Sequence, residues 1–414
     1  MNEEIKDLII YDVCVIGGGA AGSVAAIWAA RAGKNVIVFD RNNSIGKKLL
    51  STGNGRCNFS NKRVESSDYP DCDPLLLDKV FEGFSLSDTI DFFRRIGIYP
   101  VSKDGWLYPI SEQARSVRDV LAYEMETLGI EIRTETPVAA IKPTPEGFTI
   151  ICEHETFYGK KCILATGGMA APKCGCLGDG YRFASEMGHT VNQPVPALTS
   201  LVAHRNPLKK AEGIRMAARV TLFVDDTEVA SDQGQLQITG GGISGIPVFQ
   251  VSRYASRALN EGRTVRAEVC FLPQISSEDM KTELNERFKK RGLSSYQAMI
   301  GLFPDKLADV LLKAAGCDPD APADRISVES ISALLVLIES FPLAISGTGD
   351  FYQAQTTSGG VPLLEIDTAT MESRMMPGLY LCGELLDVDG YCGGYNLQWA
   401  WSSGSLAGRS VGGL

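Results

Sequence analysis

The sequence has little of what marks membrane, secreted or nucleic-acid-binding proteins. No stretch reaches about 18 consecutive apolar residues, so we expect no membrane-spanning helix. The first ten residues, MNEEIKDLII, lack the long apolar run and small-residue cleavage site of a secretory signal. Lys and Arg number 40 against 50 Asp and Glu, which gives a formal net charge of −10. This balance argues against a nucleic-acid partner, because phosphate-backbone binding depends on clustered Lys and Arg.

Patterns that bind metals are also missing. The three histidines, His154, His189 and His204, lie in no motif, and we expect them to be structural or exposed. The eleven cysteines are an odd number, and only Cys174 and Cys176 form a tight pair. No Cys spacing is typical of a zinc or iron–sulfur site. We therefore expect no metal, reduced thiols and a cytoplasmic location.

Glycine is abundant, at 43 residues, and its most informative cluster lies near the start of the chain. An apolar strand at 13–16 leads into Gly17-Gly18-Gly19-Ala20-Ala21-Gly22, and a helix of small residues follows at 23–32. A second apolar strand, 36–39, ends at Asp40. This order of strand, glycine turn, helix, strand and acid predicts a dinucleotide-binding unit. An ordinary glycine-rich turn is the alternative.

Each glycine of the predicted turn has a mechanical role. Gly17 permits the tight turn, Gly19 lets the backbone approach a pyrophosphate, and Gly22 allows helix and strand to pack closely. The N-terminus of the helix presents free N–H groups and the positive end of its dipole to the phosphates. Asp40 follows Gly17 by 23 residues, where an acid accepts hydrogen bonds from a ribose.

Two further segments extend this site. The loop after Asp40, residues 41–61, is rich in Gly, Asn and Ser and carries Lys47, Lys48 and Arg56. Such a loop can wrap a cofactor with backbone amides and pair its phosphates with cations; a plain surface loop is the alternative. Farther along, 161–168 reads as a buried strand that ends in glycines, where the backbone can meet the dinucleotide from the other side.

The middle of the chain has a different character. Strand-like alternation at 218–229, 235–239 and 264–271 precedes helical patterns at 277–315 and 326–340. No nucleotide motif lies there, so this block is interpreted as an inserted domain. From about residue 346 the sequence again has the pattern of a nucleotide-binding domain.

The expected fold class is therefore α/β, with a Rossmann-like domain that is discontinuous in sequence. Its first part is 1–193 and its second part is 346–414. Between them, the insert is β-rich over 194–272 and helical over 273–345. In the second part, a strand ends at Glu384 and a loop leads into a helix that starts at about Asn396.

At these residues the chain resembles the HI0933-like (YhiN/BaiN-type) FAD-dependent oxidoreductases, some of which are described as aminoacetone oxidases. The motifs that carry the resemblance span nearly the whole chain: GGGAAG (17–22), STGNGRCN (51–58), ILATGG (163–168), GGISGIP (241–247), TTSGGV (356–361) and LYLCGELLDVDGYCGGYNLQWAWSSG (379–404). The second and last strings are long and uncommon. At 173–177, KCGCL departs from the family, which more often has small polar residues there.

The resemblance implies FAD held in an extended form, with the adenine near Val138 and the flavin near the start of the last helix. Gly383 and Glu384 would contact the ribityl chain or its phosphate. The predicted cofactor-binding residues are Gly17, Gly19, Ala20, Ala21, Gly22, Asp40, Arg41, Lys47, Lys48, Asn54, Gly55, Arg56, Cys57, Asn58, Val138, Ala165, Thr166, Gly167, Gly383, Glu384, Asn396, Leu397 and Gln398.

The flavin would carry the chemistry, so the sequence identifies no catalytic residue. Tyr391, Tyr395 and Cys57 could line the flavin, and a redox role for Cys174 and Cys176 would need both thiols beside it. The helix N-terminus at Asn396 would stabilise negative charge on the reduced flavin and so favour hydride transfer.

Three functions follow, in decreasing order of support. The first is reduction of a small organic substrate by NAD(P)H, which would bind transiently because no second nucleotide-binding domain of the G-x-G-x-x-G type is visible. The second is oxidation of a small amine by dioxygen. The third is flavin-dependent RNA modification, which the acidic balance disfavours. The substrate and the oligomeric state are left open.

Overall fold

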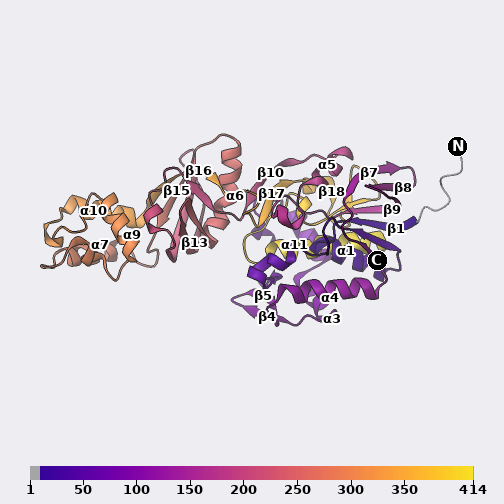
Figure 1. Ribbon diagram of the computed structural model, residues 1–414, viewed down its shortest axis with the longest axis horizontal. Coiled ribbons are helices and arrows are strands. Elements are labelled where there is room, and N and C mark those ends of the chain that lie inside the picture. Colours follow the sequence, from indigo (N-terminus) through magenta and orange to yellow (C-terminus); the bar gives the residue numbers. More distant parts are fainter. Residues whose placement is uncertain (1–9, 414) are drawn as a thin grey trace. The chain divides into compact units, whose positions relative to one another are not determined.

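The computed structural model describes residues 10–413, and the chain divides into two compact units (Figure 1). Unit 1 consists of the chain up to Pro194 together with Thr356 onwards, and unit 2 consists of Val195–Gln355. The chain leaves unit 1 along β10 (Asn192–Ala197) and returns along β17 (Thr356–Gly360), and these two strands pair with each other. Within the described residues, no helix is long and apolar enough to cross a bilayer.

Unit 1 is built on a parallel sheet with the strand order β20-β9-β1-β2-β6. The strands are β1 (Ile10–Ile16), β2 (Val36–Phe39), β6 (Glu131–Arg133), β9 (Thr156–Leu164) and β20 (Leu379–Leu381). Every residue of β2 and of β20 is buried, as expected for parallel strands covered on both faces. The sheet therefore joins the two sequence parts of unit 1 through the pairing of β20 with β9.

Smaller strands extend this sheet or stand beside it. A hairpin of β7 (Val138–Thr144) and β8 (Gly147–Cys152) pairs with β9, and β18 (Ile366–Asp367) and β19 (Glu372–Ser373) add an antiparallel edge. A separate three-stranded sheet holds β3 (Ser60–Asn61), β5 (Trp106–Pro109) and β4 (Pro100–Lys103).

The helices of unit 1 are α1 (Ala20–Arg31), α2 (Pro74–Gly83), α3 (Leu86–Arg95), α4 (Ala114–Thr127), α5 (Asp179–Glu186) and α11 (Tyr395–Gly412). Phe84 and Ser85 separate α2 from α3, because Ser85 caps α3 and shares a capping box with Asp88.

Helices α1 and α11, from opposite ends of the chain, pack with their backbones nearly in contact (Figure 1). A Cβ atom on Gly404 would lie 2.4 Å from the carbonyl oxygen of Ala21, and one on Gly408 would lie 2.3 Å from that of Ala25. The indole N–H of Trp28 also donates to Ser405 Oγ at 3.1 Å. Glycine is therefore required at both positions, which lie one turn apart on α11, for the two helices to approach so closely.

Unit 2 contains a closed antiparallel barrel with the strand order β11-β14-β13-β12-β15-β16. Its strands are β11 (Leu201–Ala203), β12 (Arg215–Val224), β13 (Thr227–Thr239), β14 (Gly242–Gly245), β15 (Val265–Cys270) and β16 (Phe341–Thr348). Alternate residues of β12, from Ala218 to Val224, are buried in the barrel core. Helix α6 (Ile246–Asn260) packs against the barrel.

Four helices complete unit 2: α7 (Ser277–Phe288), α8 (Ser295–Met299), α9 (Asp305–Ala314) and α10 (Val328–Glu339). The structure differs from the expected pattern at two places in this unit. Asp225 and Asp226, both with positive φ, turn the chain between β12 and β13, so the alternation at 218–229 belongs to a hairpin. After the helices, β16 returns to the barrel, so the second boundary lies at Thr356, beyond the expected 346.

We expect Gly408→Val to destabilise unit 1 by about 3 kcal/mol or more, because the added side chain meets backbone atoms of Ala25 that cannot move aside. Ser410→Ala, in the last turn of the same helix, is the matched control and should change stability by less than about 0.5 kcal/mol. Urea unfolding followed by tryptophan fluorescence measures both. Equal stability of the two variants would show that the helices do not depend on this contact.

Candidate cofactor site

In the glycine turn between β1 and α1, two glycines pack against the protein backbone and a third borders open space. Gly17 has φ +105°, and a Cβ there would lie 2.4 Å from the carbonyl oxygen of Ala165, at the end of β9. A Cβ on Gly22 would lie 1.8 Å from the carbonyl oxygen of Gly17. A Cβ on Gly19 would meet no atom within 4 Å. Gly17 and Gly22 are thus required by the protein itself, whereas Gly19 borders space that a ligand can fill.

The N-terminus of α1 opens onto this space. Gly19 is the N-cap and carries no side chain to cap the helix, and Ser23 makes the first intrahelical bond, to the Gly19 carbonyl at 3.0 Å. The N–H groups of Ala20, Ala21 and Gly22 have no acceptor within the helix. Free N–H groups at the positive end of a helix are suited to a pyrophosphate, so these residues fit the group that the resemblance implies.

Asp40 is buried and holds the turn to the loop that follows it. Its Oδ2 accepts the N–H of Gly18 at 3.0 Å, and its Oδ1 accepts both the backbone N–H and the side-chain amide of Asn42, at 2.8 and 2.9 Å. An ionised carboxylate has about four acceptor positions, so one is left for a ribose hydroxyl. Contact of Asp40 with the ribose stays a prediction.

Three of the predicted cations have protein partners. Arg41 forms an ion pair with Asp179 of α5 at 2.5 Å, and Lys47 Nζ donates to Asn42 Oδ1 at 3.4 Å. The exposed Arg56 places its guanidinium 5.6 Å from the centre of the Tyr108 ring. Arg41 and Lys47 thereby lie beside the loop that Asp40 orders.

Lys48 and Glu384, 336 residues apart, form an ion pair at 2.6 Å. Burial would lower the pKa of Lys48, but the neighbouring Glu384 outweighs it and leaves the pKa raised, so Lys48 is a cation at neutral pH. The other oxygen of Glu384 accepts the N–H of Thr357 at 3.0 Å. The structure thus joins two residues that the sequence predicted separately, one from each end of the chain.

The loop that contains STGNGRCN is held in an uncommon backbone conformation. Gly53, Asn54, Gly55 and Cys57 all have positive φ, between +55° and +83°. Cys57 is fully buried, and burial raises the pKa of its thiol to about 12. The thiol is therefore neutral at physiological pH, which argues against Cys57 as a nucleophile. Left-handed residues other than glycine cost energy and concentrate at functional sites.

Asn58 follows this loop and lies against the start of α11. Its Oδ1 atom is buried and has no hydrogen-bond partner among the described residues. A Cβ on Gly394, the N-cap of α11, would lie 2.9 Å from that oxygen. A buried polar atom without a partner is rare in native proteins, and its presence here fits a bound group that carries a donor.

At the start of α11, fewer backbone N–H groups are free to contact a flavin than the sequence predicts. The N–H of Gln398 donates to the Gly394 carbonyl at 3.0 Å, so the free N–H groups expected at the flavin are reduced to those of Asn396 and Leu397. The side chain of Gln398 is buried and bonds to Ser60, Thr89 and Ser402. Gln398 therefore ties α11 to its neighbours.

Asn396 closes the loop before α11. Its side-chain amide accepts the N–H of Gly390 at 2.8 Å and donates to the carbonyl of the same residue at 3.0 Å. This bidentate contact holds the loop in a defined shape and leaves the backbone N–H of Asn396 to face outward from the helix end.

The remaining predicted residues lie along the ends of β9 and β20. Ala165 packs on Gly17, and the side chain of Thr166 lies against Gly180. A Cβ on Gly383 would lie 2.9 Å from that of Ala21, so β20 ends beside α1. Gly167 has φ +72°, and Val138, at the start of β7, is 8% exposed.

Sequence reasoning missed several hydroxyl groups at this site. Thr357 Oγ1 accepts the N–H groups of Met169 and Ala170, at 2.8 and 3.0 Å, and so holds the glycine segment after β9. The hydroxyl of Thr356 is buried without a hydrogen-bond partner among the described residues. TTSGGV is the signal in the sequence, but hydroxyl partners 187 to 188 residues away cannot be read from it.

The cysteine pair and two of the histidines are the next candidates. Cys174 and Cys176 are free thiols, and burial raises the pKa of Cys176 to about 11. In the part of the chain that the structure describes, no group of His, Cys, Asp and Glu could hold a metal ion. His154 and His204 are exposed.

His189 lies at the centre of a buried network. Its Nδ1 lies 2.7 Å from Glu365 Oε2, and its Nε2 lies 2.7 Å from Ser373 Oγ. Ser373 Oγ already accepts the N–H groups of Met375 and Met376, so its hydroxyl hydrogen points to Nε2. His189 thus donates to Glu365 and ties α5 to the edge of the sheet.

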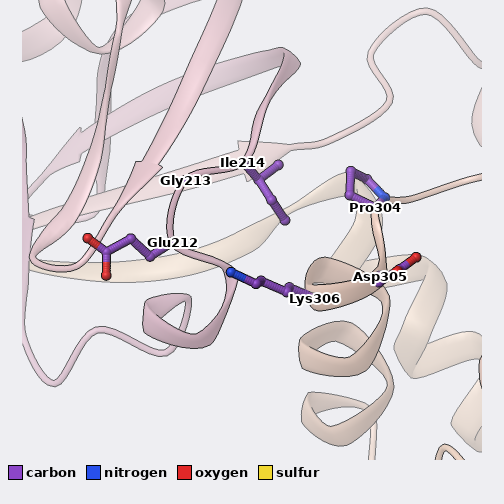
Figure 2. A pocket seen from close by; sticks show the side chains of 6 residues that line it. All are labelled: Glu212, Gly213, Ile214, Pro304, Asp305 and Lys306. Atoms are coloured by element: carbon purple, nitrogen blue, oxygen red, sulfur yellow. The ribbon is translucent and has the colours of Figure 1, made fainter.

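A surface depression of about 480 Å³ lies in unit 2, between the segment before β12 and the start of α9 (Figure 2). Glu212, Gly213, Ile214, Pro304, Asp305 and Lys306 line it. None of the predicted cofactor-binding residues belongs to it, and we assign it no role.

Comparisons with known proteins bear on this site. The model of the family described as "HI0933-like protein Rossmann domain" matches residues 11–410. The chain is 41% identical over 400 residues to a 3-dehydro-bile acid delta(4,6)-reductase of Clostridium scindens, covering 96% of this chain and 98% of that protein. It is 30% identical to a ribosomal RNA dihydrouridine synthase of Escherichia coli, covering 95% and 96%.

Among solved structures, a 3-ketosteroid-delta4-(5alpha)-dehydrogenase from Rhodococcus jostii RHA1 matches with a TM-score of 0.52 at 16% identity, over 99% of this chain and 98% of that one. This likeness concerns the fold. Together with the family match, it confirms the α/β fold class, a Rossmann-type FAD-binding domain with a β-barrel insert. The predicted enzyme class, an FAD-dependent oxidoreductase, is also confirmed.

We expect Gly19→Ala to cost the cofactor-free chain no more than about 1 kcal/mol, the loss of a good N-cap residue, because the new methyl group meets no protein atom. The same change should weaken FAD binding about tenfold or more, because the methyl group enters the space of the pyrophosphate. Gly22→Ala is the contrasting variant and should unfold at much lower urea, since its methyl group meets the Gly17 backbone. Unchanged FAD affinity in Gly19→Ala would contradict the assignment.

We expect Glu365→Gln to destabilise unit 1 by about 1–3 kcal/mol at pH 7, because it weakens the bonds from His189 and Thr190. Burial raises the pKa of Glu365, but those bonds lower it further, so the net shift is downward. A carboxylate with a lowered pKa stabilises the fold above its unfolded pKa, and this contribution is lost as the pH falls through the folded value. The deficit of the variant should therefore shrink below about pH 4.

Urea unfolding at pH 7 and at about pH 3.5 measures this difference. Glu153→Gln, at a carboxylate whose side chain is 77% exposed, is the control and should match wild type at both pH values. A deficit of Glu365→Gln that stays constant with pH would argue against an ionised Glu365 in the network.

Proposed function

Because the chain belongs to the HI0933-like protein family, we propose that it is an FAD-dependent reductase of carbon–carbon double bonds conjugated to a carbonyl group. The substrate is a small cyclic organic molecule, and a reduced nicotinamide is the transient electron donor. The observation that carries this proposal is the 41% identity, over nearly the full length of both chains, to a reductase of a 3-dehydro-bile acid.

The names of the relatives share one chemistry. A 3-dehydro, delta(4,6) bile acid has ring double bonds next to a 3-oxo group, and the uracil ring reduced by a dihydrouridine synthase has a double bond next to its 4-oxo group. In both substrates the carbonyl withdraws electrons from the alkene, so hydride adds to the far carbon and a proton follows. A flavin can deliver hydride to either substrate. The names of the relatives therefore support the reaction class more strongly than they support any one substrate.

FAD, when bound, supplies the hydride chemistry; the protein supplies orientation and charge. The free N–H groups at the start of α11 would hold the pyrimidine ring of the flavin and stabilise negative charge on it. The N-terminus of α1 would hold the pyrophosphate. Lys48 and Glu384 form an ion pair beside Thr357, so this side of the site adds little net charge.

Reduction of a uracil base in RNA is a second candidate, favoured by the 30% identity to the Escherichia coli synthase. The net charge of −10 is a poor match for an RNA backbone, so we rank it below a small molecule. Oxidation of a small amine by dioxygen ranks third, because relatives that match over nearly their full length are named for reduction or for dihydrouridine synthesis.

We expect NADH or NADPH to bleach the flavin of the FAD-loaded chain under anaerobic conditions. Adding a 3-oxo-4,6-diene steroid should then restore the flavin absorbance, because the diene accepts the hydride, whereas the saturated 3-oxo steroid should not. Stopped-flow absorbance measures both steps, and a uridine-containing rRNA fragment and aminoacetone serve as comparison substrates. Restoration by the rRNA fragment alone, or bleaching by aminoacetone alone, would overturn the proposal in favour of that alternative.

A further inference from the structure

Binding of a pyrophosphate at the glycine turn gives no reason for one buried polar atom of unit 1, the side-chain oxygen of Asn58. Asn58 is 7% exposed, and its Oδ1 has no hydrogen-bond partner among the described residues. Native proteins rarely leave a buried acceptor unpaired, because its desolvation is not compensated. The atom therefore points to a donor that a bound molecule brings.

The orphan acceptor lies at the start of α11. Gly394, the N-cap of this 18-residue helix, has φ +95°, and a Cβ there would lie 2.9 Å from Asn58 Oδ1. The N–H groups of Asn396 and Leu397 belong to the first turn, which has no acceptor inside the helix. An acceptor thus stands beside a set of donors at one helix end.

The surroundings hold these groups in place. A Cβ on Gly394 would also lie 2.5 Å from the carbonyl oxygen of Ser60, so the backbone at the helix start is tightly confined. Asn61 Nδ2 donates to the Gly393 carbonyl at 3.1 Å, and the hydroxyl of Tyr69 donates to the Tyr395 carbonyl at 2.8 Å. The acceptor and the donors are therefore set before a ligand arrives.

We propose that Asn58 and the start of α11 form a recognition site for an imide edge, the O=C–NH–C=O pattern. Asn58 Oδ1 accepts the imide N–H, and the helix N–H groups donate to a flanking carbonyl oxygen. The occupant is the pyrimidine ring of the flavin, whose N3–H lies between two carbonyl groups. This inference rests on the proposed function, and it makes Asn58 a positioning residue for the cofactor.

The test compares FAD with 3-methyl-FAD, in which a methyl group replaces the hydrogen on N3. Fluorescence titration of the cofactor-free chain gives both dissociation constants without any turnover. The wild-type chain should bind 3-methyl-FAD about tenfold or more weakly than FAD, because the analogue has no N3–H to donate. Asn58→Ala should bind the two flavins with nearly equal affinity, whereas Asn58→Asp keeps an acceptor and should still discriminate.

Asn206→Ala is the control. Asn206 lies in unit 2, where its side-chain amide donates to the carbonyls of Thr239 and Gly240, so its loss should leave the ratio of the two affinities as in wild type. Equal affinity of the wild-type chain for both flavins would overturn the inference. Discrimination that persists in Asn58→Ala would also overturn it, because another group would then contact N3–H.

Uracil carries the same imide edge, so uridine and 3-methyluridine form a second arm with the FAD-loaded chain. Uridine binding that is lost in Asn58→Ala, with no effect on flavin discrimination, would assign the site to a substrate and contradict the flavin assignment. These results do not depend on reduction of a substrate. A chain that discriminates between flavins but does not reduce the dienone would contradict the proposed function alone.

Discussion

The close contact between α1 and α11 is the constraint on which the rest of unit 1 depends. Gly404 and Gly408 let the last helix of the chain approach the carbonyl groups of the first one, and Gly383 brings the end of β20 against Ala21. Any side chain at these positions would separate the glycine turn from the start of α11. Because the pyrophosphate and the flavin of one FAD molecule must be held together, this packing determines whether the two ends of the chain can form one site.

The features that the sequence predicted well depend on interactions between residues that are close together in the chain. The glycine turn, α1 and the start of α11 follow from backbone freedom, small residues and capping, each of which acts over a few residues. The pairing of Lys48 with Glu384, the bonds of Thr357 Oγ1 with residues 169–170 and the contacts of Gln398 with Ser60 and Thr89 join residues that are more than 180 positions apart in sequence. Periodicity carries no information on such partners. The return of β16 to the barrel was missed for the same reason, since its neighbours, β11 and β15, lie on the other side of the helices in sequence.

The chemistry of the site follows from what its polar groups do. Most of them bind one another: Asp40 orders a loop, Lys48 pairs with Glu384, and Asn396 closes a turn. The groups left over include the helix N–H groups and the buried side-chain oxygen of Asn58 beside the start of α11. Donors at two helix ends and an acceptor beside one of them suit a dinucleotide flavin, and no acid or base is needed for hydride transfer itself.

The central claim is that the two ends of the chain form a single FAD site. A crystal structure of the chain with FAD tests it most directly. We expect one FAD per chain, with the pyrophosphate against Gly19 and the pyrimidine ring at Asn396 and Leu397. An FAD molecule bound elsewhere, with the glycine turn between β1 and α1 left without contact to the cofactor, would contradict it.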